Sequence, residues 1–343
     1  MSYQPWGAAP GYGTPQPQLR GPVIPFRPLT IGNLFEGSFA AIRSNPKVMF
    51  VFSLVVMGAI GLLGGIGSAV LAQSAGYYSE FGLDPSSLYV GGVGVAAAAA
   101  QALMSLLQSL ATLLVTGMLA IAVTGAVVGA NRALKGTWDE LKPRLLPLIG
   151  TSLLVGLIVV GPLLVAVLAA GFGVLVAASM GAGTEVTLLL APLLLAPALA
   201  LLGAFLGVRL CFATIITVVE KVGVTEAIKR SWTLTRGAFW RTAGRLILMG
   251  LAVGAISGAF NGVLSGLIGL LGSVAPVWVV MLLTAVVTGL IVGVVQPFSG
   301  SYATLMYVDE RIRTEGLAPT LQAALDANVA AQQNWPGGQP SPL

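Results

Sequence analysis

The side chains that usually perform chemistry in proteins are scarce in this chain. None of its 343 residues is a histidine, which excludes His-based acid–base catalysis, His-ligated metals and an imidazole pH switch. The one cysteine, Cys211, forms neither an intrachain disulfide nor a thiolate metal cluster by itself. The glycine-rich stretch 91–100 lacks the Lys-Ser/Thr pair of a phosphate-binding loop. The sequence therefore predicts a protein that is not an enzyme and that holds no cofactor and no metal.

Neutral polar side chains are the remaining candidates for a site. Several lie on one face of an otherwise apolar helical segment, and others follow in two later segments. We call this set the polar seam: Gln101, Ser105, Gln108, Thr112, Asn261 and Gln296. Lipid does not solvate such groups, so we expect them to face other helices or water. Two interpretations stay open, namely interhelical hydrogen bonds worth about 1 kcal/mol each and a cavity for a neutral or lipid-like solute.

The composition places these residues in a membrane. Hydrophobic residues make up 56% of the chain and charged residues only 8%, with a mean hydropathy of +0.91, whereas soluble proteins carry about 25% charged residues. A helix needs about 20 apolar residues to cross a bilayer core of roughly 30 Å. Six segments are long enough, and they predict an all-α polytopic membrane protein: 48–72, 93–129, 145–178, 186–208, 242–271 and 277–307.

Basic residues predict the orientation of these spans. Every Lys and Arg lies before the first span, between spans two and three, around the junction of spans four and five, or after the last span. The other three connections contain only the acids Glu80, Asp84 and Glu185. By the positive-inside rule both termini are cytoplasmic. The net charge of +5 then faces an anionic lipid leaflet, and we expect no nucleic acid partner.

Two details of the charged edge are also predicted. Arg209 follows a stretch that is already long enough to cross, so its side chain should reach the cytoplasmic headgroups. Asp309, Glu310 and Glu315 alternate with Arg311 and Arg313 after the last span, which is typical of i,i+4 pairing on a helix surface.

The ends of the chain differ in composition from its middle. Residues 1–28 are rich in Pro, Gly, Gln and Tyr, and 316–343 end in NWPGGQPSPL. Such segments bury too little apolar surface to offset their ordering entropy. We therefore expect disordered cytoplasmic tails at 1–28 and 316–343, with a six-span membrane domain at 29–315.

Amphipathic stretches precede three pairs of spans. In the first, Phe35 and Phe39 recur at helical spacing between the cap Thr30 and Asn45-Pro46. A shift of 193 residues superposes Phe39 on Trp232 and Arg43 on Arg236. A third, weaker match starts at Gly136. The pattern indicates a threefold repeat of an interfacial helix followed by a hairpin of spans, although any cytoplasmic entry to a span tends to be amphipathic and basic.

Glycines recur at every fourth position in the fifth segment, at 250, 254, 258, 262 and 266. Such a ladder lets the backbone of another helix approach closely. We expect this face to pack against a helix.

Three stretches carry a family resemblance: RPLTIGNLFEGSFAAIRSNP (27–46), VRLCFATIITVVEKVGVTEAIKRSWTLTRGAFWRTAG (208–244) and YATLMYVDERIRTEGL (302–317). They resemble multi-pass membrane proteins of actinobacteria that are similar to the membrane domain attached to some glycerophosphodiester phosphodiesterases. The resemblance implies a plasma-membrane protein, and for stand-alone members a largely undefined activity. No catalytic residue carries over, because the phosphodiesterase domain is absent and that enzyme class relies on histidines.

The sequence thus favours a non-catalytic membrane component, either a scaffold or an accessory to envelope assembly or transport, with a membrane-protein partner. The alternative is a transporter of a neutral or lipid-like solute through the polar seam.

Overall fold

A computed structural model describes residues 23–80, 92–130, 133–180, 185–272 and 274–333. Within these ranges every regular element is helical, and six helices are long and apolar enough to cross a membrane. The chain is therefore a multi-pass membrane protein of the all-α class. The long helices are α2 (Phe52–Glu80), α4 (Gly92–Val127), α6 (Leu145–Met180), α7 (Glu185–Leu210), α10 (Phe239–Leu271) and α11 (Val277–Glu315). They coincide with the six predicted segments, whose number is confirmed.

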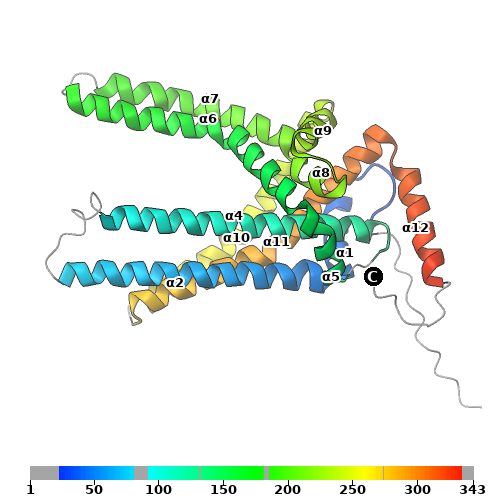
Figure 1. Cartoon of the computed structure of the whole chain (residues 1–343), viewed down its shortest axis with the longest axis horizontal. Coiled ribbons are helices and arrows are strands. Elements are labelled where there is room, and N and C mark those ends of the chain that lie inside the picture. The colour runs from blue at the N-terminus through cyan, green and yellow to red at the C-terminus, as the bar shows by residue number, and fades with distance from the viewer. Residues whose placement is uncertain (1–22, 81–91, 131–132, 181–184, 273, 334–343) are drawn as a thin grey trace, which may run out of the picture.

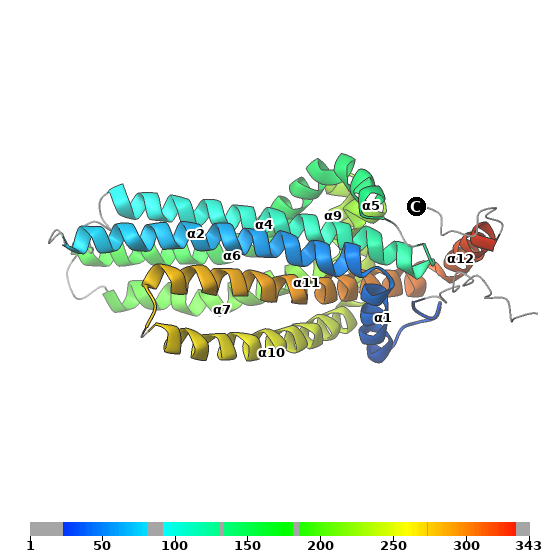
Figure 2. The same ribbon diagram turned by 90° about the horizontal axis from the view of Figure 1, so that it is seen from below.

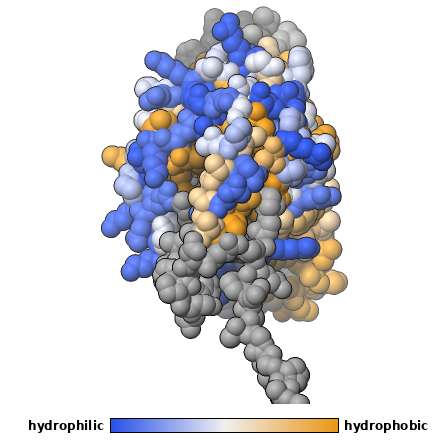
Figure 3. All heavy atoms as spheres, turned by 90° about the vertical axis from the view of Figure 1, so that its right-hand side faces the viewer, coloured by the Kyte–Doolittle hydropathy of each residue, from blue (hydrophilic) through white to orange (hydrophobic). Residues whose placement is uncertain are grey.

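Shorter helices gather at one end of the long ones (Figure 1). They are α1 (Ile31–Ser44), α5 (Leu134–Leu141), α8 (Ala213–Val219), α9 (Val224–Arg236) and α12 (Ala318–Gln333). A π-helical turn at Lys47–Val51 joins α1 to α2, and a 3₁₀ turn at Lys142–Arg144 joins α5 to α6. Hydrophilic side chains cover this end of the molecule (Figure 3). We call it the basic end.

Local sequence explains the short helices at the basic end. The Thr30 side chain accepts a hydrogen bond from the Asn33 amide at 3.2 Å and so caps α1, as predicted. Asn45 ends this helix just before Pro46, because a proline disfavours helical backbone in the residue before it. In α9 the buried residues Ala227, Ser231 and Leu234 recur at helical spacing.

The tightest helix pair is α2 with α11, and glycines make it so. A Cβ atom added at Gly289 would lie 2.6 Å from the Met57 carbonyl oxygen and 2.9 Å from the Gly61 Cα. One at Gly61 would lie 2.7 Å from the Ala285 carbonyl oxygen. The two backbones therefore touch along a small-residue seam.

The apolar core lies around α4 and the second half of α11. In α4, the helix with the largest buried share, Met118, Leu119 and Val123 have almost no exposed surface. They belong to one buried cluster with Leu34 of α1 and Leu305 of α11. The core thus sits toward the basic end, where short and long helices meet.

Helix α10 lies at the margin of the bundle (Figure 2). None of the most apolar window of Phe239–Leu271 is buried inside the chain. A Cβ atom added at any of the five ladder glycines meets nothing within 4 Å. The close packing predicted at this ladder is therefore not made by the described part of the chain.

Both predicted tails differ from the structure. Ile24 is buried against Gly37 and Leu29 has almost no exposed surface, so part of the segment before α1 belongs to the core. The tail expected at 316–343 contains α12, whose Leu325 is buried and whose Asn328 amide donates to the Val128 carbonyl at 2.8 Å. Apolar residues at helical spacing overrode the polar composition of this segment. Residues 1–22 and 334–343 lie outside the described ranges.

Candidate functional site

Two carboxylates near the end of α11 are completely buried. Asp309 and Glu310 have no exposed surface, and both face arginines of α10. Arg245 Nη1 donates to Asp309 Oδ2 at 2.6 Å, and Arg241 donates to both oxygens of Glu310 at 3.0 and 2.6 Å. Arg313 Nε adds a bond of 2.8 Å to Asp309 Oδ2. We call these five residues the buried ionic cluster.

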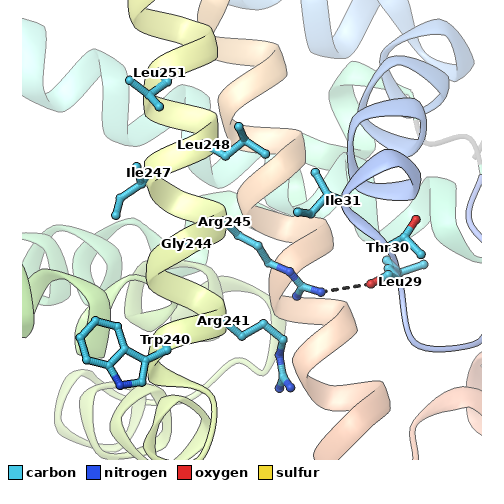
Figure 4. A pocket seen from close by; sticks show the side chains of 10 residues that line it. All are labelled: Leu29, Thr30, Ile31, Trp240, Arg241, Gly244, Arg245, Ile247, Leu248 and Leu251. Carbon is cyan, nitrogen blue, oxygen red and sulfur yellow. Dashed lines mark hydrogen bonds between the residues drawn. The ribbon is translucent and has the colours of Figure 1, made fainter.

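The segment before α1 is tied into the same cluster. The Leu29 amide donates to Asp309 Oδ1 at 2.6 Å, and the Leu29 carbonyl accepts from Arg245 at 3.1 Å and from Arg313 at 2.9 Å. Figure 4 shows Arg245 of α10 reaching this carbonyl. Three parts of the chain more than 60 residues apart thus meet at one carboxylate.

The position of the cluster along α11 explains why charges are tolerated there. This helix has 39 residues and a length of about 58 Å at 1.5 Å per residue, well beyond the roughly 30 Å of a bilayer core. Asp309 follows the first helical residue, Val277, by more than the 20 residues of a crossing. The carboxylates therefore lie farther along α11 than a single crossing that begins at Val277 requires.

A second ionic group surrounds Glu220, the residue after α8. Tyr307 Oη donates to Glu220 Oε1 at 2.6 Å, and Arg230 Nε donates to Glu220 Oε2 at 3.0 Å. Arg311 donates to Tyr307 Oη at 3.1 Å and to Glu315 at 2.9 Å. Because Arg230 also pairs with Glu315, this group joins α8, α9 and α11.

These carboxylates are held as structural groups. Each accepts two or more hydrogen bonds from arginines or other donors of the chain. Predicted i,i+4 pairs are present, Arg313 with Asp309 and Arg311 with Glu315. The longer-range partners, Arg241, Arg245 and Glu220, were missed. Arg241 and Arg245 are four residues apart on α10, so both guanidinium groups lie on the helix face that meets Asp309 and Glu310. This spacing is the only feature of the sequence that could have indicated the pairing.

The polar seam is assembled only in part. Gln296 of α11 donates to the Thr116 hydroxyl of α4 at 3.1 Å, and the Gln108 amide contacts the Met57 sulfur of α2 at 3.5 Å. Ser105 and Thr112 donate to carbonyls one turn earlier in α4, and Gln101 and Ser105 are exposed. Asn261 is exposed on α10 and donates to its own helix. The two contacts between helices fit the packing interpretation for Gln108 and Gln296, whereas the bonds of Ser105, Thr112 and Asn261 within their own helices distinguish neither interpretation.

The predicted interfacial residues have distinct environments. Phe35 and Phe39 of α1 pack on Phe298 of α11, with ring centroids 5.6 and 5.2 Å apart. Trp232 of α9 contacts Phe205 of α7 edge-on. The remaining two residues, Arg43 and Arg236, are exposed.

Two cavities flank the start of α10, and both are lined by Trp240 and Arg241. One, of about 570 Å³, lies between α10 and the start of α1, and its walls include Ile31, Leu248 and Leu251 (Figure 4). The other, of about 590 Å³, lies between α10 and the ends of α7 and α9. Arginines and apolar side chains line both cavities, as suits an amphiphilic anion.

Arg209 lines the cavity between α7, α9 and α10. Its side chain was predicted to extend outward to the headgroups, but it is packed among aromatic rings instead. Its guanidinium carbon lies 5.1–5.4 Å from the ring centroids of Phe205, Trp232 and Phe239. Cation–π attraction to three rings holds the group inside. Its carbonyl accepts bonds from Ser231 at 2.9 Å and Thr235 at 3.2 Å, which fix α9 against α7.

Comparison with known proteins gives one match. The sequence model of a family described as "Domain of unknown function (DUF7847)" matches residues 29–309, which include Arg241, Arg245 and Asp309 of the buried ionic cluster and Leu29, which bonds to it. No curated protein and no solved structure matches the chain.

Proposed function

The chain belongs to the DUF7847 family, and we propose that it is a non-catalytic integral protein of the plasma membrane. It would act as a scaffold or accessory component of envelope assembly or membrane transport, with a partner membrane protein. The carboxylates Asp309, Glu310 and Glu220 of the basic end join helices through ion pairs, which supports a structural role for them. Five of the six spans, in contrast, have at most a third of their most apolar window buried inside the chain, and α4 is the exception.

The exposed face of α10 carries this proposal. Its five ladder glycines face open space, and Asn261 and Ser265 lie exposed beside them. The Asn261 amide donates one bond to its own helix, to the Ser257 carbonyl at 2.8 Å. Lipid tails offer no partner to its remaining polar groups, whereas a facing helix offers both close packing and polar groups. The occupant we propose is a transmembrane helix of a partner protein.

Photo-crosslinking in native membranes tests this role. A photo-reactive residue in place of Ser265 should form an adduct with one membrane protein. Gly258→Leu should reduce that adduct at least fivefold, because the added side chain fills the groove that the partner helix would occupy. The yield is measured by immunoblotting and mass spectrometry of the adduct.

The matched control is Gly156→Leu in α6, where an added Cβ also meets nothing within 4 Å. It should leave the adduct unchanged. Adducts with lipid alone, or equal losses in both variants, would exclude a protein partner on this face of α10.

The proposed orientation places the basic end in the cytoplasm. Support comes from the positive-inside rule. Exposed aromatic residues near this end, Phe39, Trp138, Trp232 and Trp240, support its position at a membrane–water interface, but such residues gather at both interfaces and do not distinguish the two sides. A green fluorescent protein fused after Leu343 should therefore fluoresce, and alkaline phosphatase fused there should be inactive. Active phosphatase with a dark fluorescent protein would reverse the orientation.

The proposed repeat gains support from burial. A short helix precedes two long ones three times, as α1–α2–α4, α5–α6–α7 and α9–α10–α11. Across the 193-residue shift, Ser38 and Ser231 are both fully buried, whereas Phe39 and Trp232 are both exposed. Equal burial at equivalent positions is expected of a duplicated unit.

A further inference from the structure

The cavity between α7, α9 and α10 presents three cations. Arg209, Arg236 and Arg241 line it together with Phe205, Phe239 and Trp240. None of its lining residues is acidic. We call it the arginine pocket, and its charge calls for an anion.

Arg209 is the most telling member. Its Nε and Nη1 atoms are buried and have no hydrogen-bond partner, although buried donors are nearly always bonded. The three surrounding rings supply attraction but no acceptor lone pair in the plane of the guanidinium. Arg209 also has no ion pair with a carboxylate among the described residues, so the positive charge that it brings to the cavity is not neutralised by the described part of the chain.

The other two arginines differ in how they are held. Arg241 is anchored by two bonds to the buried Glu310, so its position is fixed. Arg236 ends α9 and is exposed, with no ion pair among the described residues. One oriented cation, one unsatisfied cation and one accessible cation thus share the same cavity.

The surroundings indicate an amphiphile. Trp240 is 84% exposed at the mouth, and the exposed apolar residues Ile247 and Leu251 continue from it along α10. Figure 4 shows the neighbouring cavity, between α10 and the start of α1, with Trp240 and Arg241 at its lower end and the apolar residues of α10 above. A headgroup in the arginine pocket could therefore extend its chains along the apolar surface of α10.

We infer that the arginine pocket binds the phosphate of an anionic phospholipid. The planar fork of arginine matches phosphate oxygens, and basic pockets beside transmembrane helices are suited to anionic headgroups. This inference rests on the proposed function only in placing the basic end at a lipid leaflet. It does not involve the exposed glycine face of α10, so the lipid and partner experiments can fail separately.

Native mass spectrometry of the detergent-solubilised full chain tests the pocket. Dioleoylphosphatidylglycerol should bind at least tenfold more tightly than dioleoylphosphatidylcholine. Arg236→Gln should remove most of this preference, and Arg209→Gln should remove it as well. Because Arg236 is exposed, its substitution leaves the fold intact, and thermal unfolding of each variant checks this.

The matched control is Arg43→Gln, which removes the same charge from the equivalent position of α1, outside the pocket. It should leave the preference unchanged. If Arg43→Gln lost the lipid preference to the same extent, the preference would come from the overall positive charge of the basic end and not from the arginine pocket, which would overturn the inference. Equal binding of the two lipids would overturn it, and so would displacement of the lipid by an equal concentration of soluble glycerol phosphate, since the pocket would then recognise a free phosphate.

Discussion

Asp309→Asn should lower the free energy of unfolding by about 3–5 kcal/mol, the usual cost of breaking a buried ion pair. The Asp309 carboxylate bonds Arg245, Arg313 and the Leu29 amide. An amide of the same shape carries no charge, so Arg245, whose side chain is only 6% exposed, is left without its main counterion. Unfolding by sodium dodecyl sulfate in mixed micelles, followed by circular dichroism, measures the loss.

A double variant separates charge from packing. Asp309→Leu with Arg245→Met removes both charges and should recover much of the stability that either single variant loses, because apolar replacement of a buried pair is often neutral or stabilising. The exposed Arg43→Gln should change stability by less than about 0.5 kcal/mol. A wild-type unfolding curve for Asp309→Asn would show that the cluster does not hold α10, α11 and the N-terminal segment together.

The buried ionic cluster lies at the end of the molecule where the helices are most closely connected. At the basic end, buried charges and the apolar core connect α1, α4, α10 and α11. Farther along, most of the surface of α6 and α10 is uncovered, with 11% and none of their apolar windows buried. A well-packed basic end, together with spans such as α6 and α10 that the rest of the chain leaves uncovered, suits a protein that presents helices to other membrane components.

The six spans could be predicted because each depends on local composition alone. An apolar run of about 20 residues has few alternatives to a transmembrane helix, and the caps of α1 follow from adjacent residues such as Thr30 and Asn45. The helix α12 was missed because its apolar residues, such as Leu321 and Leu325, are packed against residues far away in the sequence, Leu325 beside Gly129. Burial of this kind depends on tertiary contacts.

The ionic partners were missed for the same reason. Arg245 and Asp309 are separated by 64 residues, and nothing in either local sequence selects the other. Arg209 shows a related limit, because its aromatic neighbours Trp232 and Phe239 come from two later helices. The positions of the charges lead to a proposed orientation, whereas the pairing of the charges required the fold.

Glycine spacing did not predict which helix face is in close contact within the chain. The ladder of α10 has the stronger pattern, yet the close contact within the chain is made by Gly61 and Gly289, with Gly293 against α2. Spacing shows that a backbone can be approached closely. It does not show which helix approaches.

Gly289→Ala should therefore destabilise the protein by about 1–3 kcal/mol, as overpacking does. The new methyl group would lie 2.6 Å from the Met57 carbonyl oxygen and 2.9 Å from the Gly61 Cα. Both are backbone atoms, so a rotamer change cannot relieve the clash, and α2 must move away from α11. Thermal unfolding in detergent, followed by near-ultraviolet circular dichroism, measures the effect.

Gly258→Ala is the control from the same kind of sequence. Its methyl group meets nothing within 4 Å, so packing is unchanged, and the higher helix propensity of alanine adds up to about 1 kcal/mol. Both substitutions add the same methyl group, so any difference between them comes from its surroundings. The midpoint of thermal unfolding should fall for Gly289→Ala and should rise or stay unchanged for Gly258→Ala. Equal shifts of the unfolding midpoint in the two variants would mean that α2 and α11 are not in backbone contact. A loss of stability for Gly258→Ala in native membranes but not in detergent would indicate that a helix of another protein packs at Gly258.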